Sequence, residues 1–375
     1  MPTRVYSYLA IVIGVAVDPF AGAAAAADWP MVRHDPQRSA VTSHPLAEEL
    51  HLQWTLQLPE PQRAWPWQQD DFERLAFDAS YEPVVVGDTL FVASMTNDSV
   101  TAYDLDSGQQ RWRYQTDGPV RLAPRVWQDR VYAASDDGTL HCLDASSGRR
   151  IWRFQAAPNN RLVLGNRRLI SMWPLRGGPV IADGTLYFAA GIWPHDGSFL
   201  YAVDAETGEL QWVNSGNSSD ILEDSKGYFS FGGVAPQDPL VVAGDHLLVP
   251  GGRTVPAAFD RHTGELRYYH VAGRATGKAA GGHQVFVQDD WFFNRRDRYV
   301  TDMYHVADGA QWGSVHVDLV TPELLLGVQA GEDRVYAYLC PCQLGTGEIF
   351  WKSQFLPRAG GLRLRAGWTM ARRPA

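Results

Sequence analysis

Polar and aromatic side chains that could recognise a ligand are concentrated in three long segments of the sequence. Residues 156–178 carry several arginines and a tryptophan, residues 214–238 carry acidic and aromatic side chains, and residues 270–283 are rich in glycine. Loops of this kind on a rigid scaffold commonly form a funnel for a polar ligand. Solvent-exposed surface is the alternative interpretation of each residue. The candidates for contacting a ligand or cofactor are Arg167, Arg168, Trp173, Arg176, His195, Asp196, Lys226 and His283.

Two patterns resemble catalytic or nucleotide-binding chemistry without completing it. The His195-Asp196 pair could act as an acid and base, but a polar turn between two strands explains it equally well. Residues 273–279 are one position shorter than a phosphate-binding loop and have Ala279 where Ser or Thr would bind magnesium. We therefore assign no catalytic residue from the sequence.

The three cysteines do not indicate a metal site. Cys340 and Cys342 are too close in sequence for an unstrained disulfide, and no histidine or second cysteine pair accompanies them at zinc-binding spacing. Cys142 occupies a small-residue position in the repeat described next. We expect it to be a buried, unreactive thiol, and we expect no metal ligands in the chain.

A short repeat identifies the scaffold that must position these segments. Each copy has a small residue, Asp two positions later, Ser/Thr-Gly three and four positions beyond the Asp, and an aromatic residue four after the Gly. The Asp can accept backbone N–H groups in a tight turn, and the Gly can adopt a positive φ. The aromatic residue then lies on the following strand. Clear copies end at Trp112, Trp152 and Trp212, weaker copies end at Tyr268 and Trp351, and residues 305–312 look like a copy shortened by one residue.

An apolar, β-rich hairpin precedes each copy, with a polar turn such as Gly87-Asp88 or Asp183-Gly184. Four short strands in a unit of about 40 residues are typical of a β-propeller blade. The predicted fold class is therefore all-β, a β-propeller of four-stranded antiparallel blades with six repeats visible.

The repeat resembles the tryptophan-docking motif of the PQQ-like (pyrroloquinoline quinone) β-propellers, Ala-x-Asp-x-x-Thr-Gly-x-x-x-Trp. The resemblance covers most of residues 81–351, and Trp54 looks like part of the lead-in strand of such proteins. It implies seven or eight blades, with the Trp54 strand completing the last one and closing the ring. The matching docking residues are Asp104, Gly108, Trp112, Asp144, Gly148, Trp152, Asp204, Gly208, Trp212, Asp260, Gly264, Gly347 and Trp351.

The two ends of the sequence predict three parts. Arg4, an apolar run over 5–17 and small residues over 21–27 are typical of a signal peptide cleaved near Ala27. The propeller then occupies 28–355, and residues 356–375 form a basic tail that is disordered or truncated. We expect a periplasmic or secreted protein without a membrane span. The formal net charge of -9 argues against nucleic acid as a partner.

Two functions remain open at this point. The first is a non-catalytic binding module or scaffold for a protein, peptide or carbohydrate, with no cofactor. The alternative implied by the resemblance is a quinoprotein dehydrogenase that holds PQQ and calcium and oxidises alcohols or sugars. Many alcohol-oxidising members have a disulfide between adjacent cysteines, which this sequence lacks. No trio of Glu, Asn and Asp that could bind calcium and the quinone can be placed from the sequence.

Overall fold

A computed structural model of the chain describes residues 28–45, 49–65, 77–165, 167–217, 221–223, 229–251, 255–270, 282–295, 301–315, 319–320, 324–330, 335–341 and 351–355. The predicted signal peptide, the basic tail, Lys226, Gly347 and the glycine-rich stretch 273–279 lie outside these residues.

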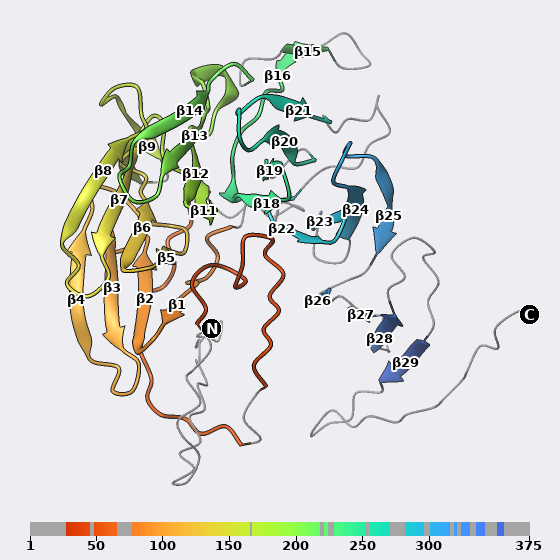
Figure 1. Cartoon of the computed structure of the whole chain (residues 1–375), viewed down its shortest axis with the longest axis horizontal. Coiled ribbons are helices and arrows are strands. Elements are labelled where there is room, and N and C mark those ends of the chain that lie inside the picture. The colour runs from red at the N-terminus through yellow and green to blue at the C-terminus, as the bar shows by residue number, and fades with distance from the viewer. Residues whose placement is uncertain are drawn as a thin grey trace, which may run out of the picture.

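Six sheets of sequential antiparallel strands follow one another along the described chain, and each forms one blade. Figure 1 shows them in chain order, from orange through yellow and green to blue, around the red N-terminal segment. The prediction of an all-β propeller of four-stranded antiparallel blades is confirmed. The strands of blade 1 are β1 (Val84–Val86), β2 (Thr89–Ser94), β3 (Ser99–Asp104) and β4 (Gln110–Gln115); those of blade 2 are β5 (Arg125–Trp127), β6 (Arg130–Ala134), β7 (Thr139–Asp144) and β8 (Arg150–Gln155).

Blade 3 has a fifth strand, because β17 (Asp238–Pro239) adds to its inner strand in parallel. Two short hairpins, β9 (Leu162–Gly165) with β10 (Arg168–Ser171) and β15 (Ile221–Glu223) with β16 (Phe229–Phe231), lie in the long connections before and after blade 3. The strands of blade 3 are β11 (Gly177–Ala182), β12 (Thr185–Ala190), β13 (Phe199–Asp204) and β14 (Leu210–Asn214); those of blade 4 are β18 (Val241–Ala243), β19 (His246–Val249), β20 (Ala257–Asp260) and β21 (Leu266–Tyr268).

Blades 5 and 6 complete the series. The strands of blade 5 are β22 (Val285–Gln288), β23 (Trp291–Arg295), β24 (Thr301–His305) and β25 (Gln311–Val315); those of blade 6 are β26 (Leu319–Val320), β27 (Leu324–Ala330), β28 (Val335–Pro341) and β29 (Trp351–Phe355).

The repeat motif forms the turn between the third and fourth strands of a blade. In blade 2, Asp144 Oδ1 accepts the backbone N–H of Ser147 at 2.8 Å, and Gly148 has φ +67°. The Trp112 ring from blade 1 lies against Gly148, and its Nε1 donates to the carbonyl oxygen of Ala145 at 2.9 Å. A side chain at Gly148 would collide with that ring. Only glycine therefore meets both the conformational and the packing requirement.

The same contact joins successive blades. Each aromatic residue lies on the motif glycine of the next blade and donates a hydrogen bond to a carbonyl oxygen of its turn. The pairs are Trp54 with Gly108, Trp112 with Gly148, Trp152 with Gly208, Trp212 with Gly264, and Tyr268 with Gly309. Trp54 thus docks on blade 1, but residues 49–65 form no strand, so the strand predicted to complete the last blade is not observed there.

Blades 5 and 6 depart from the sequence interpretation. In blade 5 the register pairs Met303 with Gly313, so Gly313 takes the docking position and Trp312 is left 41% exposed. The unit is therefore not shortened; its aromatic residue is displaced by one position. In blade 6, the motif alignment implied that Trp351 pairs with Pro341, but Trp351 pairs with Leu339.

Residues 28–41, which we call the axial segment, run along the inner strands of five blades. Trp29 pairs with Val85 of blade 1, and the carbonyl oxygen of Pro30 accepts the N–H of Val126 in blade 2. The carbonyl oxygens of Pro36 and Gln37 accept N–H groups from blades 4 and 5. The Arg38 side chain donates to the carbonyl oxygen of Pro179 in blade 3. The centre of the blade array is thus occupied by the chain itself.

The meander places the long connections around blade 3 at one end of the blades. The turns between first and second strands, and between third and fourth, lie at one end, while the other loops and the connections between blades lie at the opposite end. We call this second end the loop face. Residues 156–176, 191–198 and 215–237 belong to it.

Candidate functional site

Four buried charges form a network on the loop face. Arg121 donates to Asp136 through Nε at 2.6 Å and to Asp78 through Nη1 at 2.7 Å. Arg176 donates to both carboxylate oxygens of Asp136, each at 3.2 Å. Burial tends to raise the pKa of Asp136, but the charges of Arg176 and Arg121 outweigh it and hold that pKa below its usual value. The network fixes the connections that enter blades 1, 2 and 3.

Aromatic side chains lie directly beside this network. The Arg176 guanidinium is 5.6 Å from the centre of the Trp65 ring, and the Trp193 ring meets Trp65 edge-on at 5.2 Å. The next residues, Pro194–Asp196, form a 3-10 turn that Trp173 holds through a 2.7 Å bond from Nε1 to the carbonyl oxygen of Asp196. We call Trp65, Trp173, Trp193 and His195 the aromatic rim.

The outer part of the aromatic rim is accessible to solvent. Trp193 is 43% exposed, and the side chain of His195 is 48% exposed. Exposed tryptophan beside polar groups is a common arrangement for binding carbohydrate or peptide, because the ring offers a large rigid surface at low entropic cost. The aromatic rim therefore offers an accessible surface that a ligand could contact, with His195 Nε2 3.3 Å from Asp196 Oδ2 at its edge.

A second polar cluster lies where blades 3, 4 and 5 begin. His283 Nδ1 is 2.7 Å from Asp238 Oδ2, and both side chains are largely buried. Burial and the charge of Asp238 raise the pKa of Glu82 to about 7. Burial also lowers the pKa of Arg38, on the axial segment, to about 10. These groups interact with one another inside the blade array.

The structure thus divides the residues singled out from sequence. Trp173, Arg176, His195 and Asp196 come together at the aromatic rim, whereas His283 belongs to the second cluster. Arg168 instead pairs with Asp98 and donates to the carbonyl oxygen of Met95, which ties β10 to blade 1.

The last of these residues, Arg167, lies exposed in the β9–β10 turn. Its backbone is in the left-handed region, with φ +72°. That position is typical of a hairpin turn, and the structure brings it to neither the aromatic rim nor the second cluster.

Sequence reasoning missed several residues of this region. The sequence between Trp65 and Phe77 contains no copy of the repeat, and the pattern around Asp136 and Gly138 predicts only a turn. Arg121 lies in a short connection between blades. Only the tertiary contacts bring these residues to Arg176, so no local pattern could have identified them.

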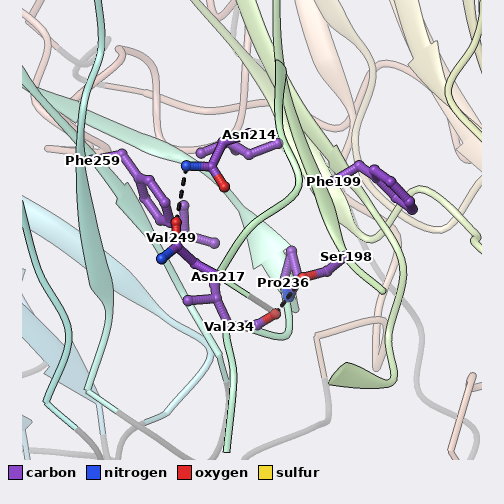
Figure 2. A pocket seen from close by; sticks show the side chains of 9 residues that line it. Ser198, Phe199, Asn214, Asn217, Val234, Pro236, Val249 and Phe259 are labelled. Carbon is purple, nitrogen blue, oxygen red and sulfur yellow. Dashed lines mark hydrogen bonds between the residues drawn. The ribbon is translucent and has the colours of Figure 1, made fainter. Parts of the chain in front are cut away.

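A small hollow lies between blades 3 and 4 (Figure 2). Phe259, Val249 and Leu200 line it, and Asn214 Nδ2 donates across it to Asn217 Oδ1 at 2.9 Å. Asn214 also donates to the carbonyl oxygen of Gly264. Because the Asn214 amide nitrogen already donates to two groups of the protein, the hollow resembles a packing gap more than a binding site.

Cys142 is fully buried in the core between blades 2 and 3. Burial raises the pKa of its thiol to about 12, so the reactive thiolate is strongly disfavoured. Cys340 lies in β28, and Cys342 lies outside the described residues.

The carboxylates of the loop face are a poor match to calcium. Calcium takes six to eight oxygen ligands, commonly from several carboxylates. Asp78 and Asp136 are engaged by arginines, and Asp238 is engaged by His283. Within the described ranges, no three His, Cys, Asp or Glu side chains converge on a point that could hold a metal ion.

Comparison with known proteins identifies the family. A family model described as outer membrane protein assembly factor BamB, built on PQQ-like repeats, matches residues 52–291 and 128–353. The chain belongs to this family. Its docking repeats and its fold agree with that membership.

Curated relatives of two kinds match parts of the chain. The dehydrogenase subunit of alcohol dehydrogenase (quinone) from Gluconobacter oxydans is 28% identical over 40% of this chain and 22% of the relative. Quinohemoprotein alcohol dehydrogenase ADH-IIG from Pseudomonas putida is 25% identical over 66% of this chain and 34% of the relative. BamB from Yersinia pestis is 26% identical over 56% of this chain and 54% of the relative. The chain therefore spans a minor part of the dehydrogenases and about half of BamB.

Solved structures agree on the fold. Quinohemoprotein alcohol dehydrogenase from Comamonas testosteroni superposes with a TM-score of 0.55 at 14% identity, covering 88% of this chain and 67% of that one. A europium-containing methanol dehydrogenase gives 0.53 at 13% identity, covering 87% and 78%. Within the described residues, no helix is both long enough and apolar enough to cross a membrane.

Proposed function

We propose that this chain is an exported, non-catalytic propeller that binds a protein, peptide or carbohydrate through the aromatic rim of its loop face. The observation that carries the proposal is the axial segment. Its backbone and the Arg38 side chain bond to the inner strands of five blades, in the region where a quinoprotein would hold its cofactor. The family match to an assembly factor supports the same reading.

The electrostatics of the loop face favour binding over redox chemistry. Arg121 and Arg176 form ion pairs with Asp78 and Asp136, so their charges are balanced while they position Trp65 and the aromatic rim. A buried ion-pair network of this kind sets geometry. The exposed faces of Trp193 and His195 remain to contact a ligand.

A fluorescence titration tests the proposal. Purified protein would be titrated with oligomers of glucose and of N-acetylglucosamine, and with a peptide copying one strand of an outer-membrane β-barrel. Trp193→Ala removes the most exposed tryptophan of the rim, and Trp312→Ala is the control, because Trp312 is similarly exposed at 41% on the outer strand of blade 5. We expect binding that Trp193→Ala abolishes and Trp312→Ala preserves. Equal loss in both variants would contradict the rim as the binding surface.

A PQQ- and calcium-dependent alcohol dehydrogenase is the second candidate, and the curated dehydrogenase relatives favour it. The test adds PQQ and calcium to the purified chain and follows Tm and then dye reduction with alcohols and sugars. Stabilisation together with dye reduction would establish this function and refute the non-catalytic one.

A further inference from the structure

One inner-strand position of blade 2 carries a charge where blades 1, 3 and 4 carry valine. In blade 1 the cross-strand register runs from Val84 through Phe91 and Ala102 to the docking residue Trp112. The same ladder in blade 2 begins at Arg125 and ends at Trp152.

The corresponding residues of blades 3 and 4 are Val180 and Val241. These two valines and Val84 are 0% exposed. Arg125 therefore stands at a position that blades 1, 3 and 4 fill with a buried valine.

The Arg125 guanidinium is buried and forms no ion pair with a carboxylate among the described residues. The residue is 7% exposed, and its Nε and Nη1 atoms have no hydrogen-bond partner among the described residues. Burial, with the nearby charge of Arg38, lowers the pKa of Arg125 to about 9. Proteins pair nearly all buried polar groups, and an unpaired buried charge is strongly unfavourable. A group required only for packing would not be an arginine here.

The neighbouring groups do not neutralise it. Arg38 donates to the carbonyl oxygens of Val32, Pro179 and Leu240. These acceptors are neutral, so they do not cancel the positive charge of Arg38.

Asp35 is the acidic group whose charge favours protonated Arg125. Its two carboxylate oxygens accept the backbone N–H and the hydroxyl of Ser39. Neither Arg38 nor Arg125 forms an ion pair with any carboxylate in the described part of the chain.

We propose that Arg125, beside Arg38, binds a small oxyanion at the inner edge of blades 2 and 3. A guanidinium is a planar set of N–H donors that matches phosphate and carboxylate oxygens, and a second cation at its side adds attraction. The ligand class is thus an inorganic phosphate or a carboxylate group. The site is separate from the aromatic rim and does not rest on the proposed function.

The test compares Arg125→Val, which installs the residue of blades 1, 3 and 4, with a substitution of Arg150, an exposed arginine on β8 of the same blade, by valine (Arg150→Val). Inorganic phosphate and acetate are titrated separately at an ionic strength held constant with sodium chloride. Tm and isothermal titration calorimetry are the two readouts. Arg125→Met serves as a second variant if valine does not fold.

Without oxyanion, we expect Arg125→Val to melt at or above the wild-type temperature, because it removes an unpaired buried charge. Saturating phosphate or acetate should raise the wild-type Tm by about 3 °C or more. The same rise should occur in Arg150→Val and be absent in Arg125→Val, with binding at least about tenfold weaker by calorimetry.

The two probes also separate the two sources of an oxyanion. A response to phosphate alone identifies a tetrahedral anion, and a response to acetate alone identifies a carboxylate group. The proposal is refuted if neither probe shifts the wild-type Tm beyond the chloride control. It is equally refuted if Arg125→Val responds as the wild type does.

Discussion

Replacing Trp112 by alanine is the sharpest test of how the blades are joined. The Trp112 ring is almost fully buried, lies on Gly148 of blade 2 and packs against Phe91 of its own blade at 5.8 Å between ring centres. Its Nε1 donates to the carbonyl oxygen of Ala145. Removing the ring creates a cavity at the junction of blades 1 and 2. We expect a loss of about 3–5 kcal/mol in the free energy of unfolding.

The measurement is urea unfolding followed by circular dichroism, because the substitution also removes a fluorophore. With a denaturant dependence of about 3 kcal/mol/M, the loss corresponds to a fall of about 1–1.7 M in the urea midpoint. Trp112→Phe should lose about 1–2 kcal/mol, since it keeps most of the buried ring and gives up the hydrogen bond. Fluorescence of the remaining tryptophans should report the same transition if the blades unfold together.

Trp312→Ala is the matched control, because Trp312 is displaced from the docking position and is 41% exposed. Its expected loss is about 1 kcal/mol or less. A midpoint for Trp112→Ala equal to or above that of Trp312→Ala would refute the argument that docking joins the blades.

Two further predictions concern a glycine and a buried acid. Gly148→Ala should lower the free energy of unfolding in urea by about 1–3 kcal/mol more than Gly87→Ala does. Both glycines have a positive φ, but a Cβ at Gly148 would lie 2.5 Å from Trp112 Cε3, while nothing lies within 4 Å of a Cβ at Gly87. Equal losses would contradict the packing argument. Glu82 has a pKa of about 7 in the folded protein and an ordinary value of 4.5, so the folded state binds the proton more tightly and wild-type stability should fall as pH rises through that window. Glu82→Gln should remove the part of this fall in stability that Glu82 causes. Urea midpoints of wild type and Glu82→Gln that change in parallel between pH 5 and 8 would show the reasoning to be wrong.

Much of the fold follows from local patterns. The turn residues Asp104, Asp144 and Asp204 each accept the backbone N–H three positions later, as tight-turn chemistry requires. The predicted hairpin turns at Gly87-Asp88 and Asp183-Gly184 both separate paired strands. Short-range chemistry of this kind is readable without knowledge of distant contacts.

The departures come from register and from long-range contacts. The repeat spacing suggested that blade 5 was shortened, but pairing of Met303 with Gly313 keeps its length and turns Trp312 outward. The lead-in residue Trp54 docks on Gly108 without forming a strand. A register shift of one residue reverses the face of a side chain, and composition does not reveal such a shift.

The candidate site was predictable only in part. The sequence predicted that the long segments around blade 3 contact a ligand, and the structure brings Trp173, Arg176, His195 and Asp196 of these segments and the neighbouring loop together. Arg167 and Arg168 are close to Trp173 in sequence, yet β10 carries Arg168 to blade 1, where it pairs with Asp98.

The amino-acid sequence alone specifies the blade unit of this protein, because each blade is built from turns and strands whose residues are neighbours in the chain. The arrangement of charges at the centre of the blade array is instead decided by contacts between distant parts of the chain. The axial segment reaches blades 1 to 5, and Arg121 joins Asp78 to Asp136 across 43 and 15 positions of sequence. Such contacts depend on the assembled array of blades, which brings distant segments together and excludes water from the charges they carry. Packing therefore determines which polar residues are paired and which, like Arg125, have side-chain N–H groups without a partner among the described residues.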